Sequence, residues 1–252
     1  MKPKVLVAAG AGLNCENETA AAFKICGAES EIKFFTEIFD RPEILRDFQI
    51  LVFPGGFSFG DRLGAGRAAA ETLRGKIFDE LKKFAAAEKL ILGICNGFQI
   101  LANLGVFDDF EQKFALLPNS PKPRYVCRWV DLKVESKKCV FFRGVGNLKL
   151  PIAHGEGRFF ADENFLENLK TADRVAVKYL NENPNGSAES IAGVCDFTGR
   201  ICGMMPHPER NFFFHHRPDF FEKKVEFENR GEKVPEFSDG KKIFENAVGF
   251  FG

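Results

Sequence analysis

Hydrophobic positions in the first hundred residues form short continuous runs that alternate with segments of helical spacing. The continuous runs lie at Lys4–Ala9, Ile50–Phe53 and Leu90–Ile94, with a further strand candidate at 31–35. Such runs are typical of strands buried on both faces. The helix-like segments are 16–26, the stretch around 42–48, 75–87 and Asn96–Leu104. This alternation predicts an α/β fold with a mostly parallel sheet covered by helices.

The second half of the chain adds strand candidates and closes on an amphipathic helix. The strand candidates are Val126–Val134, 151–153, 174–179, 190–196 and 201–205, and the closing helix is 241–251. No repeat or flexible linker divides the sequence, so we expect one α/β domain over residues 1–252.

One segment, residues 211–240, departs from this pattern. It is dense in charge and contains Pro218 and Pro235. We expect a surface excursion before the last helix, with its phenylalanines packed on the domain itself in preference to a partner.

Charge and hydropathy exclude several classes of protein. The chain has 35 Lys+Arg against 35 Asp+Glu, so its formal net charge is zero and a nucleic-acid partner is not expected. There is no apolar run of about 18 residues, so no membrane span is predicted. The apolar stretch at the N-terminus is too short for a signal peptide, which favours a cytoplasmic location.

Cysteine and glycine patterns give no sign of a bound cofactor. The seven cysteines lack metal-ligand spacing, and we expect no metal. His215 and His216 with Asp219 could bind a metal fortuitously, but a solvated loop is the favoured interpretation. Gly10-Ala11-Gly12 has the start of a dinucleotide fingerprint, but Cys15 stands at the third glycine position. Cys15 lies near a helix start with no partner base evident in the sequence.

The strongest chemical signal is Gly93-Ile94-Cys95-Asn96-Gly97, between a buried strand and a helix. The same G-x-nucleophile-x-G spacing forms the strand-to-helix elbow of α/β hydrolases. Cys95 would then lie at the carboxyl edge of the sheet, beside the free N–H groups of a helix N-terminus, which favour a thiolate. A buried structural cysteine between two glycines is the alternative.

A candidate base follows the last strand of the predicted sheet. Pro206 and Pro208 keep the backbone extended around His207, so His207 and Glu209 project to the same side. Glu209 could orient the imidazole while its other nitrogen faces the thiol, which predicts a Cys95–His207–Glu209 triad. For the oxyanion, the N–H groups of Gly56 and Asn96 are the candidate donors, although Gly55-Gly56 could equally be a plain tight turn.

Several longer motifs carry a family resemblance. PGGFSFGDRLGAG, GICNGFQILANLG, IAHGEGRFF, NPNGS–IAG and GMMPHPER occur in this order. Together with GLNCENETAAAF and KKIFENAVGFF, they resemble the glutaminase subunits of phosphoribosylformylglycinamidine synthase, which are class I (triad) glutamine amidotransferases. The resemblance covers nearly the whole chain and implies a flavodoxin-like sheet.

The resemblance also implies roles for individual residues. Cys95 would be the nucleophile, His207 the acid and base, and Glu209 its partner, with Gly56 and Asn96 as oxyanion donors. Further residues would contact glutamine or the synthetase: Gln99, His154, Gly157 and Arg158. A surface loop is the alternative for the last three. Relatives often have Tyr where this chain has Phe59 and Phe160, and with 30 Phe against 2 Tyr overall we expect no effect.

The implied activity is hydrolysis of glutamine to glutamate and ammonia. The ammonia would pass to a separate large synthetase subunit, which binds ATP and magnesium and makes formylglycinamidine ribonucleotide in purine synthesis, with a small third subunit bridging the two. No cofactor is expected on this chain. Two alternatives stay open: a non-catalytic subunit that only docks on the synthetase, and another hydrolase with the same elbow cysteine.

Overall fold

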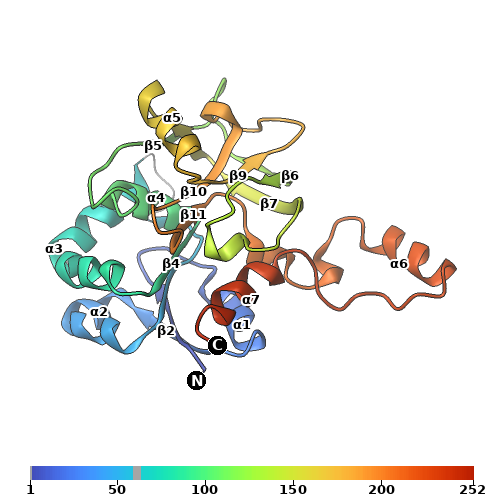
Figure 1. Cartoon of the computed structure of the whole chain (residues 1–252), viewed down its shortest axis with the longest axis horizontal. Coiled ribbons are helices and arrows are strands. Elements are labelled where there is room, and N and C mark those ends of the chain that lie inside the picture. The colour runs from blue at the N-terminus through green and yellow to red at the C-terminus, as the bar shows by residue number, and fades with distance from the viewer. Residues whose placement is uncertain (1, 59–63) are drawn as a thin grey trace.

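A single large sheet runs through the protein and is parallel on the side where the elbow lies (Figure 1). The computed structural model describes residues 2–58 and 64–252, and over these it contains a nine-stranded sheet and a two-stranded ribbon. The large sheet has the order β2-β1-β3-β4-β11-β10-β9-β6-β7. Its first five strands are parallel, and the other four are added antiparallel. The α/β class expected from the sequence is confirmed.

The strands agree closely with the hydrophobic runs. They are β1 (Lys4–Ala9), β2 (Glu29–Phe34), β3 (Ile50–Phe53), β4 (Leu90–Ile94), β5 (Ala115–Pro118), β6 (Val126–Val134), β7 (Leu148–His154), β8 (Glu156–Phe160), β9 (Val175–Tyr179), β10 (Ile191–Cys195) and β11 (Ile201–Met204). The short ribbon strands β5 and β8 were not predicted.

The α-helices differ from the prediction mainly in length and number. They are α1 (Glu16–Ile25), α2 (Phe35–Asp40), α3 (Ala65–Ala86), α4 (Asn96–Leu104), α5 (Glu163–Thr171), α6 (Phe220–Asn229) and α7 (Lys241–Gly249). Helices α2, α5 and α6 were missed, and the segment around 42–48 is a 3-10 helix, η1 (Pro42–Asp47). No helix among the described residues is long and apolar enough to cross a membrane.

Helices cover the parallel strands on both sides (Figure 1). On one side α1 packs against α7, where the rings of Phe23 and Phe244 meet edge to face at 5.0 Å. On the other, α3 packs against α4, and Arg74 of α3 donates to the carbonyl of Asn103. The parallel register brings the carboxyl ends of β1, β3, β4 and β11 to one edge, where ligand sites of such sheets lie.

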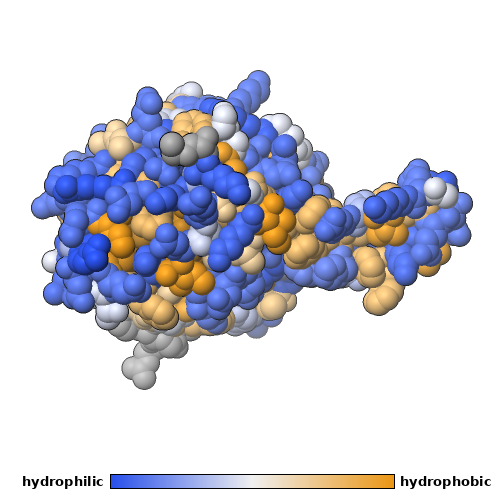
Figure 2. Space-filling model, turned by 90° about the horizontal axis from the view of Figure 1, so that it is seen from below, coloured by the Kyte–Doolittle hydropathy of each residue, from blue (hydrophilic) through white to orange (hydrophobic). Residues whose placement is uncertain are grey.

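The charged segment 211–240 projects from the body as an arm (Figures 1 and 2). At its base, Phe212 packs against Phe244 of α7 at 5.9 Å, so this phenylalanine contacts the domain as expected, and Phe213 packs against Phe237 within the arm. Helix α6, at the end of the arm, has no buried residue, and its Phe221 is 79% exposed. The expectation that the phenylalanines of this segment pack on the domain is therefore correct where the arm joins the body and wrong at α6.

Candidate active site

Cys95 occupies a strained elbow between β4 and α4. Its backbone has φ 50° and ψ −105°, a conformation that non-glycine residues adopt at functional sites. A Cβ on Gly97 would collide with the carbonyl oxygen of Phe53, and one on Gly93 would lie 2.7 Å from Leu101. Both glycines are therefore needed for the close approach of strand and helix, as their spacing predicts. The thiol is buried and lies 3.7 Å from the carbonyl oxygen of Ala153.

His207 and Glu209 form a buried pair directly after β11. Nδ1 of His207 lies 2.6 Å from Oε1 of Glu209, and the two residues are 1% and 3% exposed. The backbone N–H of His207 donates to the carbonyl of Pro151, which anchors this segment to β7. Burial opposes the charge on the ring, but Glu209 and Cys95 outweigh it and raise the pKa of His207 well above its usual value. The structure thus brings the three predicted triad residues together.

The predicted oxyanion donors are Gly56, in the turn after β3, and Asn96, the first residue of α4. Gly56 sits in an isolated bridge with Leu13, and a Cβ at Gly56 would collide with the Leu13 backbone. The Asn96 N–H belongs to the first turn of α4, where helix donors have no partner within the helix. The Asn96 side chain accepts from the Ser58 N–H at 3.1 Å, so it ties the segment after β3 to α4. The donor roles themselves stay a prediction.

Both the oxygen and the nitrogen of the Gln99 side-chain amide form hydrogen bonds within the protein. Its Oε1 accepts from Asn96 at 2.6 Å, and its Nε2 donates to the carbonyl of Glu156, the first residue of β8. These bonds fix the start of β8 to the elbow helix. Direct contact between Gln99 and a substrate stays a prediction.

The remaining predicted residues separate into two groups. His154 is 3% exposed and close enough to His207 that burial and this neighbour lower its pKa to about 3. Gly157 is needed beside it, because a Cβ there would lie 2.7 Å from Nδ1 of His154. Arg158, in contrast, donates to the carbonyl of Pro118 at 3.1 Å and so faces the two-stranded ribbon. Phe160 is 53% exposed, while Phe59 lies outside the described residues.

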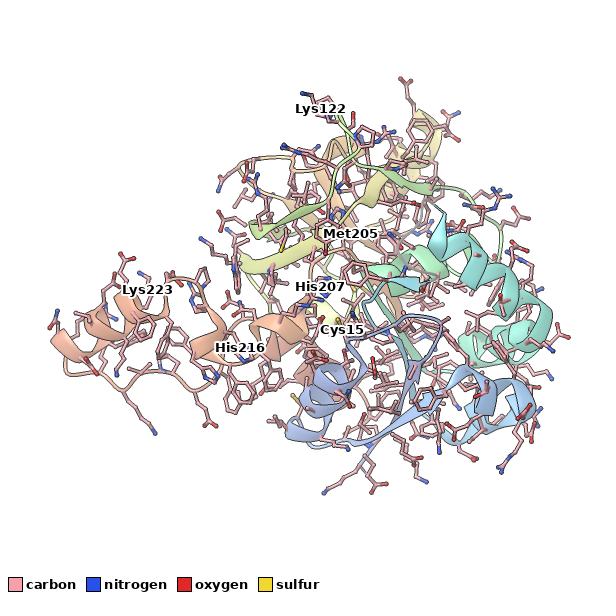
Figure 3. All side chains as sticks on the ribbon, turned by 180° about the vertical axis from the view of Figure 1, so that it is seen from behind. Cys15, Lys122, Met205, His207, His216 and Lys223 are labelled. Carbon is pink, nitrogen blue, oxygen red and sulfur yellow. The ribbon has the colours of Figure 1, made fainter. Side chains whose placement is uncertain are left out.

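Cys15, which no sequence pattern connects to the site, lies beside His207 in the fold (Figure 3). Its Sγ, a ring nitrogen of His207 and a carboxylate oxygen of Glu209 all lie within 4.8 Å of one another. The sequence gives no evident partner base for Cys15, and the fold places the imidazole of His207 next to it. These three groups could in principle hold a metal ion, but the Arg210 guanidinium lies 3.1 Å from the sulfur and opposes a cation there.

Tyr179 and the NPNGS motif were also missed as parts of the site. Tyr179, one of the two tyrosines, is buried, and burial together with the charge of Cys95 raises its pKa. Asn185 of NPNGS donates to the carbonyl of Gly157 at 3.0 Å, and Ser187 accepts from the Phe159 N–H. The motif thus supports β8, the strand that begins two residues after His154. No local signal in the sequence links these segments.

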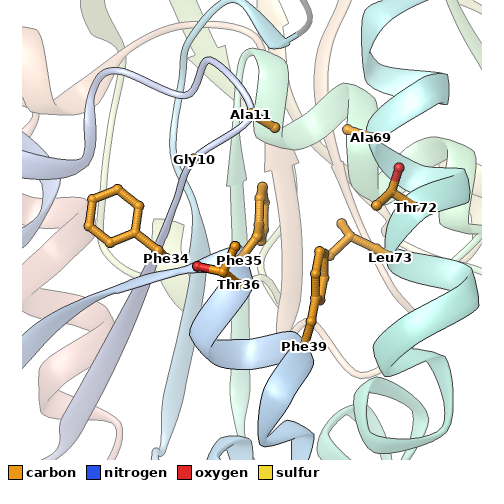
Figure 4. Close-up of a pocket in the computed structure, with 9 residues that line it drawn as sticks. All are labelled: Gly10, Ala11, Phe34, Phe35, Thr36, Phe39, Ala69, Thr72 and Leu73. Atoms are coloured by element: carbon orange, nitrogen blue, oxygen red, sulfur yellow. The ribbon is translucent and has the colours of Figure 1, made fainter.

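A separate pocket of about 220 Å³ lies at the ends of β1 and β2 (Figure 4). Its lining is mainly apolar and consists of Gly10, Ala11, Phe34, Phe35, Thr36, Phe39, Ala69, Thr72 and Leu73. None of the predicted site residues contributes to it, and its lining provides no charged group for a zwitterion. We therefore do not assign it to the reaction.

A parallel α/β sheet with an elbow cysteine and a His–Glu pair at its carboxyl edge defines the glutamine amidotransferase class. In agreement, the family model of the CobB/CobQ-like glutamine amidotransferase domain matches residues 2–251. A phosphoribosylformylglycinamidine synthase subunit PurQ of Methanococcus maripaludis is 42% identical, covering 99% of this chain and 97% of the relative. The PurQ subunit of Dehalococcoides mccartyi is 38% identical, and the match covers 98% of this chain and 97% of that relative.

Among solved structures, PurLQS from Thermotoga maritima contains a similar chain. The TM-score is 0.74 at 34% identity, and the match covers 100% of both chains. The protein belongs to the PurQ family of phosphoribosylformylglycinamidine synthase subunits.

Proposed function

We propose that this chain hydrolyses glutamine at Cys95, His207 and Glu209 and delivers the ammonia to a separate ATP-dependent synthetase subunit. That subunit would make formylglycinamidine ribonucleotide in de novo purine biosynthesis. The observation that carries the proposal is the strained elbow cysteine beside a histidine whose Nδ1 is bonded to a buried glutamate. Family membership supplies the reaction class.

The first half of the reaction transfers the acyl group to sulfur. The Cys95 thiolate attacks the side-chain amide carbon of glutamine, and the N–H groups of Gly56 and Asn96 stabilise the resulting oxyanion. His207 gives its proton to the departing nitrogen, so the C–N bond breaks and ammonia leaves. A γ-glutamyl thioester remains on Cys95.

The second half returns the enzyme to its starting state. His207, now neutral, takes a proton from water, which attacks the thioester and releases glutamate. Glu209 holds the ring in the orientation that both steps need. Gln99, His154, Gly157 and Arg158 would contact the substrate or the face toward the synthetase.

We infer that the chain acts in a complex and holds no cofactor of its own. The Thermotoga maritima relative is described as PurLQS, which supports a large synthetase partner and a small bridging subunit. ATP and magnesium would bind the synthetase. Because free ammonia escapes to solvent, we expect low glutaminase activity from the isolated chain and activation on assembly in the cytoplasm.

The decisive experiment is Cys95→Ala, assayed for glutamate release by the chain combined with its synthetase subunit. Loss of the nucleophile should lower kcat by roughly 10⁴-fold or more. Cys139→Ala is the matched control, because Cys139 is equally buried and clusters with Cys195 and Cys202. Wild-type activity in Cys95→Ala would refute the assignment.

Labelling with a glutamine-mimicking electrophile tests the remaining alternative, a non-catalytic docking subunit. We expect mass spectrometry to find the label on Cys95, with protection by glutamine. A chain that binds the synthetase normally but takes up no label would be the non-catalytic subunit.

A further inference from the structure

Cys15 reaches His207 from the β1–α1 loop, a segment that the mechanism above does not use. Its side chain is 1% exposed, and both Cys15 and Cys95 interact with the His207 ring. Gly55 lies against the same edge of the ring: an added Cβ would meet Cε1 of His207 at 2.5 Å, Nδ1 at 3.1 Å and the Cys15 sulfur at 3.4 Å. Cys15 therefore lies beside the imidazole, with its sulfur within 4.8 Å of a ring nitrogen and of the Glu209 carboxylate.

The sulfur of Cys15 is held from several directions. Nη2 of Arg210 donates to it at 3.1 Å, and the thiol donates to Oδ1 of Asn14 at 3.4 Å. The N–H groups of Asn14 and Cys15 both donate to the carbonyl of Gly55 at 3.1 Å. Arg210 follows Glu209 directly and lies 3.8 Å from its carboxylate. The hydrogen bonds around Cys15 thus link the β1–α1 loop, the Gly55-Gly56 turn and the segment that carries His207 and Glu209.

We propose that Cys15, held by Arg210, is a positioning residue that keeps the His207–Glu209 pair aligned with Cys95. The inference rests on the proposed glutaminase function. The hydrogen bond to Glu209 fixes only one ring nitrogen, so the ring can still tilt about its side-chain bonds, and the Cys15 sulfur beside it restricts this movement. Small misplacements of a catalytic group are costly, and a shift of about 1 Å can lower the rate by about 10²-fold.

The backbone at Cys15 argues against its being the nucleophile itself. Cys15 has φ −106° and ψ 21°, without the elbow conformation of Cys95, and its thiol is directed to Asn14. Both cysteines precede a helix, but only Cys95 is flanked by the two glycines of the elbow and has a positive φ. Cys15 therefore supports the base while Cys95 attacks.

The test compares Cys15→Ala with Cys15→Ser, in the chain combined with its synthetase subunit. We expect Cys15→Ala to lower kcat for glutamine hydrolysis by about 10- to 100-fold while KM stays within about twofold. Cys15→Ser keeps an atom that can accept from Arg210, so it should recover most of the rate. Cys139→Ala, which removes a remote thiol of similar burial, should behave as wild type.

The dependence of kcat/KM on pH distinguishes a positioning role from a purely structural one, because loss of a structural contact alone would not shift the profile. The groups that face His207 are Glu209, Arg210, Cys95, Cys15 and His154. Since Cys15 is among the groups that raise the pKa of His207, its removal should lower that pKa. The basic limb of kcat/KM, where His207 loses the proton it gives to ammonia, should then move to lower pH in Cys15→Ala.

Labelling separates failure of this inference from failure of the proposed function. Slower labelling of Cys95 in Cys15→Ala, with wild-type thermal stability, would support the positioning role. Wild-type kcat and pH profile in Cys15→Ala would overturn it and leave Cys95 as the nucleophile. Label on Cys15 would also overturn it, by making Cys15 the nucleophile. No label on either cysteine of the wild type would refute the glutaminase itself.

Discussion

Two histidines in one buried site have their pKa values moved in opposite directions. His207 gains a carboxylate partner and is raised, whereas His154, whose ring has no hydrogen-bond partner among the described residues, is lowered to about 3 by burial and by His207. His154 is therefore neutral at any pH at which the enzyme would work. It can contact a substrate without adding a second positive charge beside the base.

The lowered pKa of His154 predicts an acid-sensitive contribution to stability. Its folded pKa of about 3 lies below the unfolded value of about 6.5, so the unfolded chain binds more protons between these values. The contribution is fully present above pH 6.5 and is lost as the pH falls, by at most about 1.4 kcal/mol per pH unit. Urea unfolding at pH 7 and pH 5 should show a smaller decrease in His154→Asn than in wild type. An unchanged decrease would contradict the prediction, and His215→Asn on the exposed arm is the control.

At the scale of elements, glycines decide how closely strands and helices approach. Gly97 lets α4 cross the end of β3, and Gly203 of β11 makes room for the ring of Phe98 on α4. The elbow is therefore held between two strands, which keeps Cys95 in its strained conformation. Gly75, within α3, has no neighbouring atom within 4 Å of its would-be Cβ and serves no such contact.

Two glycine-to-alanine variants should therefore change stability in opposite directions. Gly97→Ala forces α4 away from Phe53 and should lower the free energy of unfolding by about 1–3 kcal/mol or more. Gly75→Ala lies in a helix interior with free space and should raise it by about 0.5–1 kcal/mol. Urea denaturation measures both, and equal effects of the two substitutions would refute the packing argument.

At the scale of the whole molecule, the arm is the part least coupled to the sheet. The outgoing and returning segments of the arm meet near the body, where the backbone N–H of Phe214 donates to the carbonyl of Glu236 at 3.0 Å. Beyond that point α6 buries no residue, so its contribution to the stability of the body is small. The helix makes one ring contact toward the base of the arm, where Phe227 of α6 packs on Phe214 with ring centroids 5.8 Å apart.

Replacement of residues 218–233 by a short Gly-Ser linker should leave the body intact. We expect Tm to fall by no more than about 2–4 °C, which corresponds to about 1 kcal/mol for a domain of this size. Glutamine hydrolysis should be unchanged, because the arm contributes none of the predicted site residues. A control that also removes Phe237 should lower Tm further, and a large loss with the shorter excision would show that the arm stabilises the body.

Local features were predictable because local physics produces them. Continuous apolar runs become buried strands, and Gly93 and Gly97 mark the elbow because only a missing Cβ permits that turn. The extended Pro-His-Pro-Glu segment likewise presents His207 and Glu209 on one side. The start of α3 at residue 65 and the short strands β5 and β8 were missed, since their patterns are too brief or too alanine-rich to be distinctive.

By itself, the sequence determined the buried strands of the parallel half, the elbow at Cys95 and the side on which His207 and Glu209 project, because each depends on residues within one short segment. Tertiary structure alone decided that Cys15 lies beside His207, that Tyr179 is close enough to Cys95 for its pKa to be raised, and that Asn185 is bonded to Gly157 of β8. These neighbours are joined by strand order and long-range packing, which no local spacing of residues encodes.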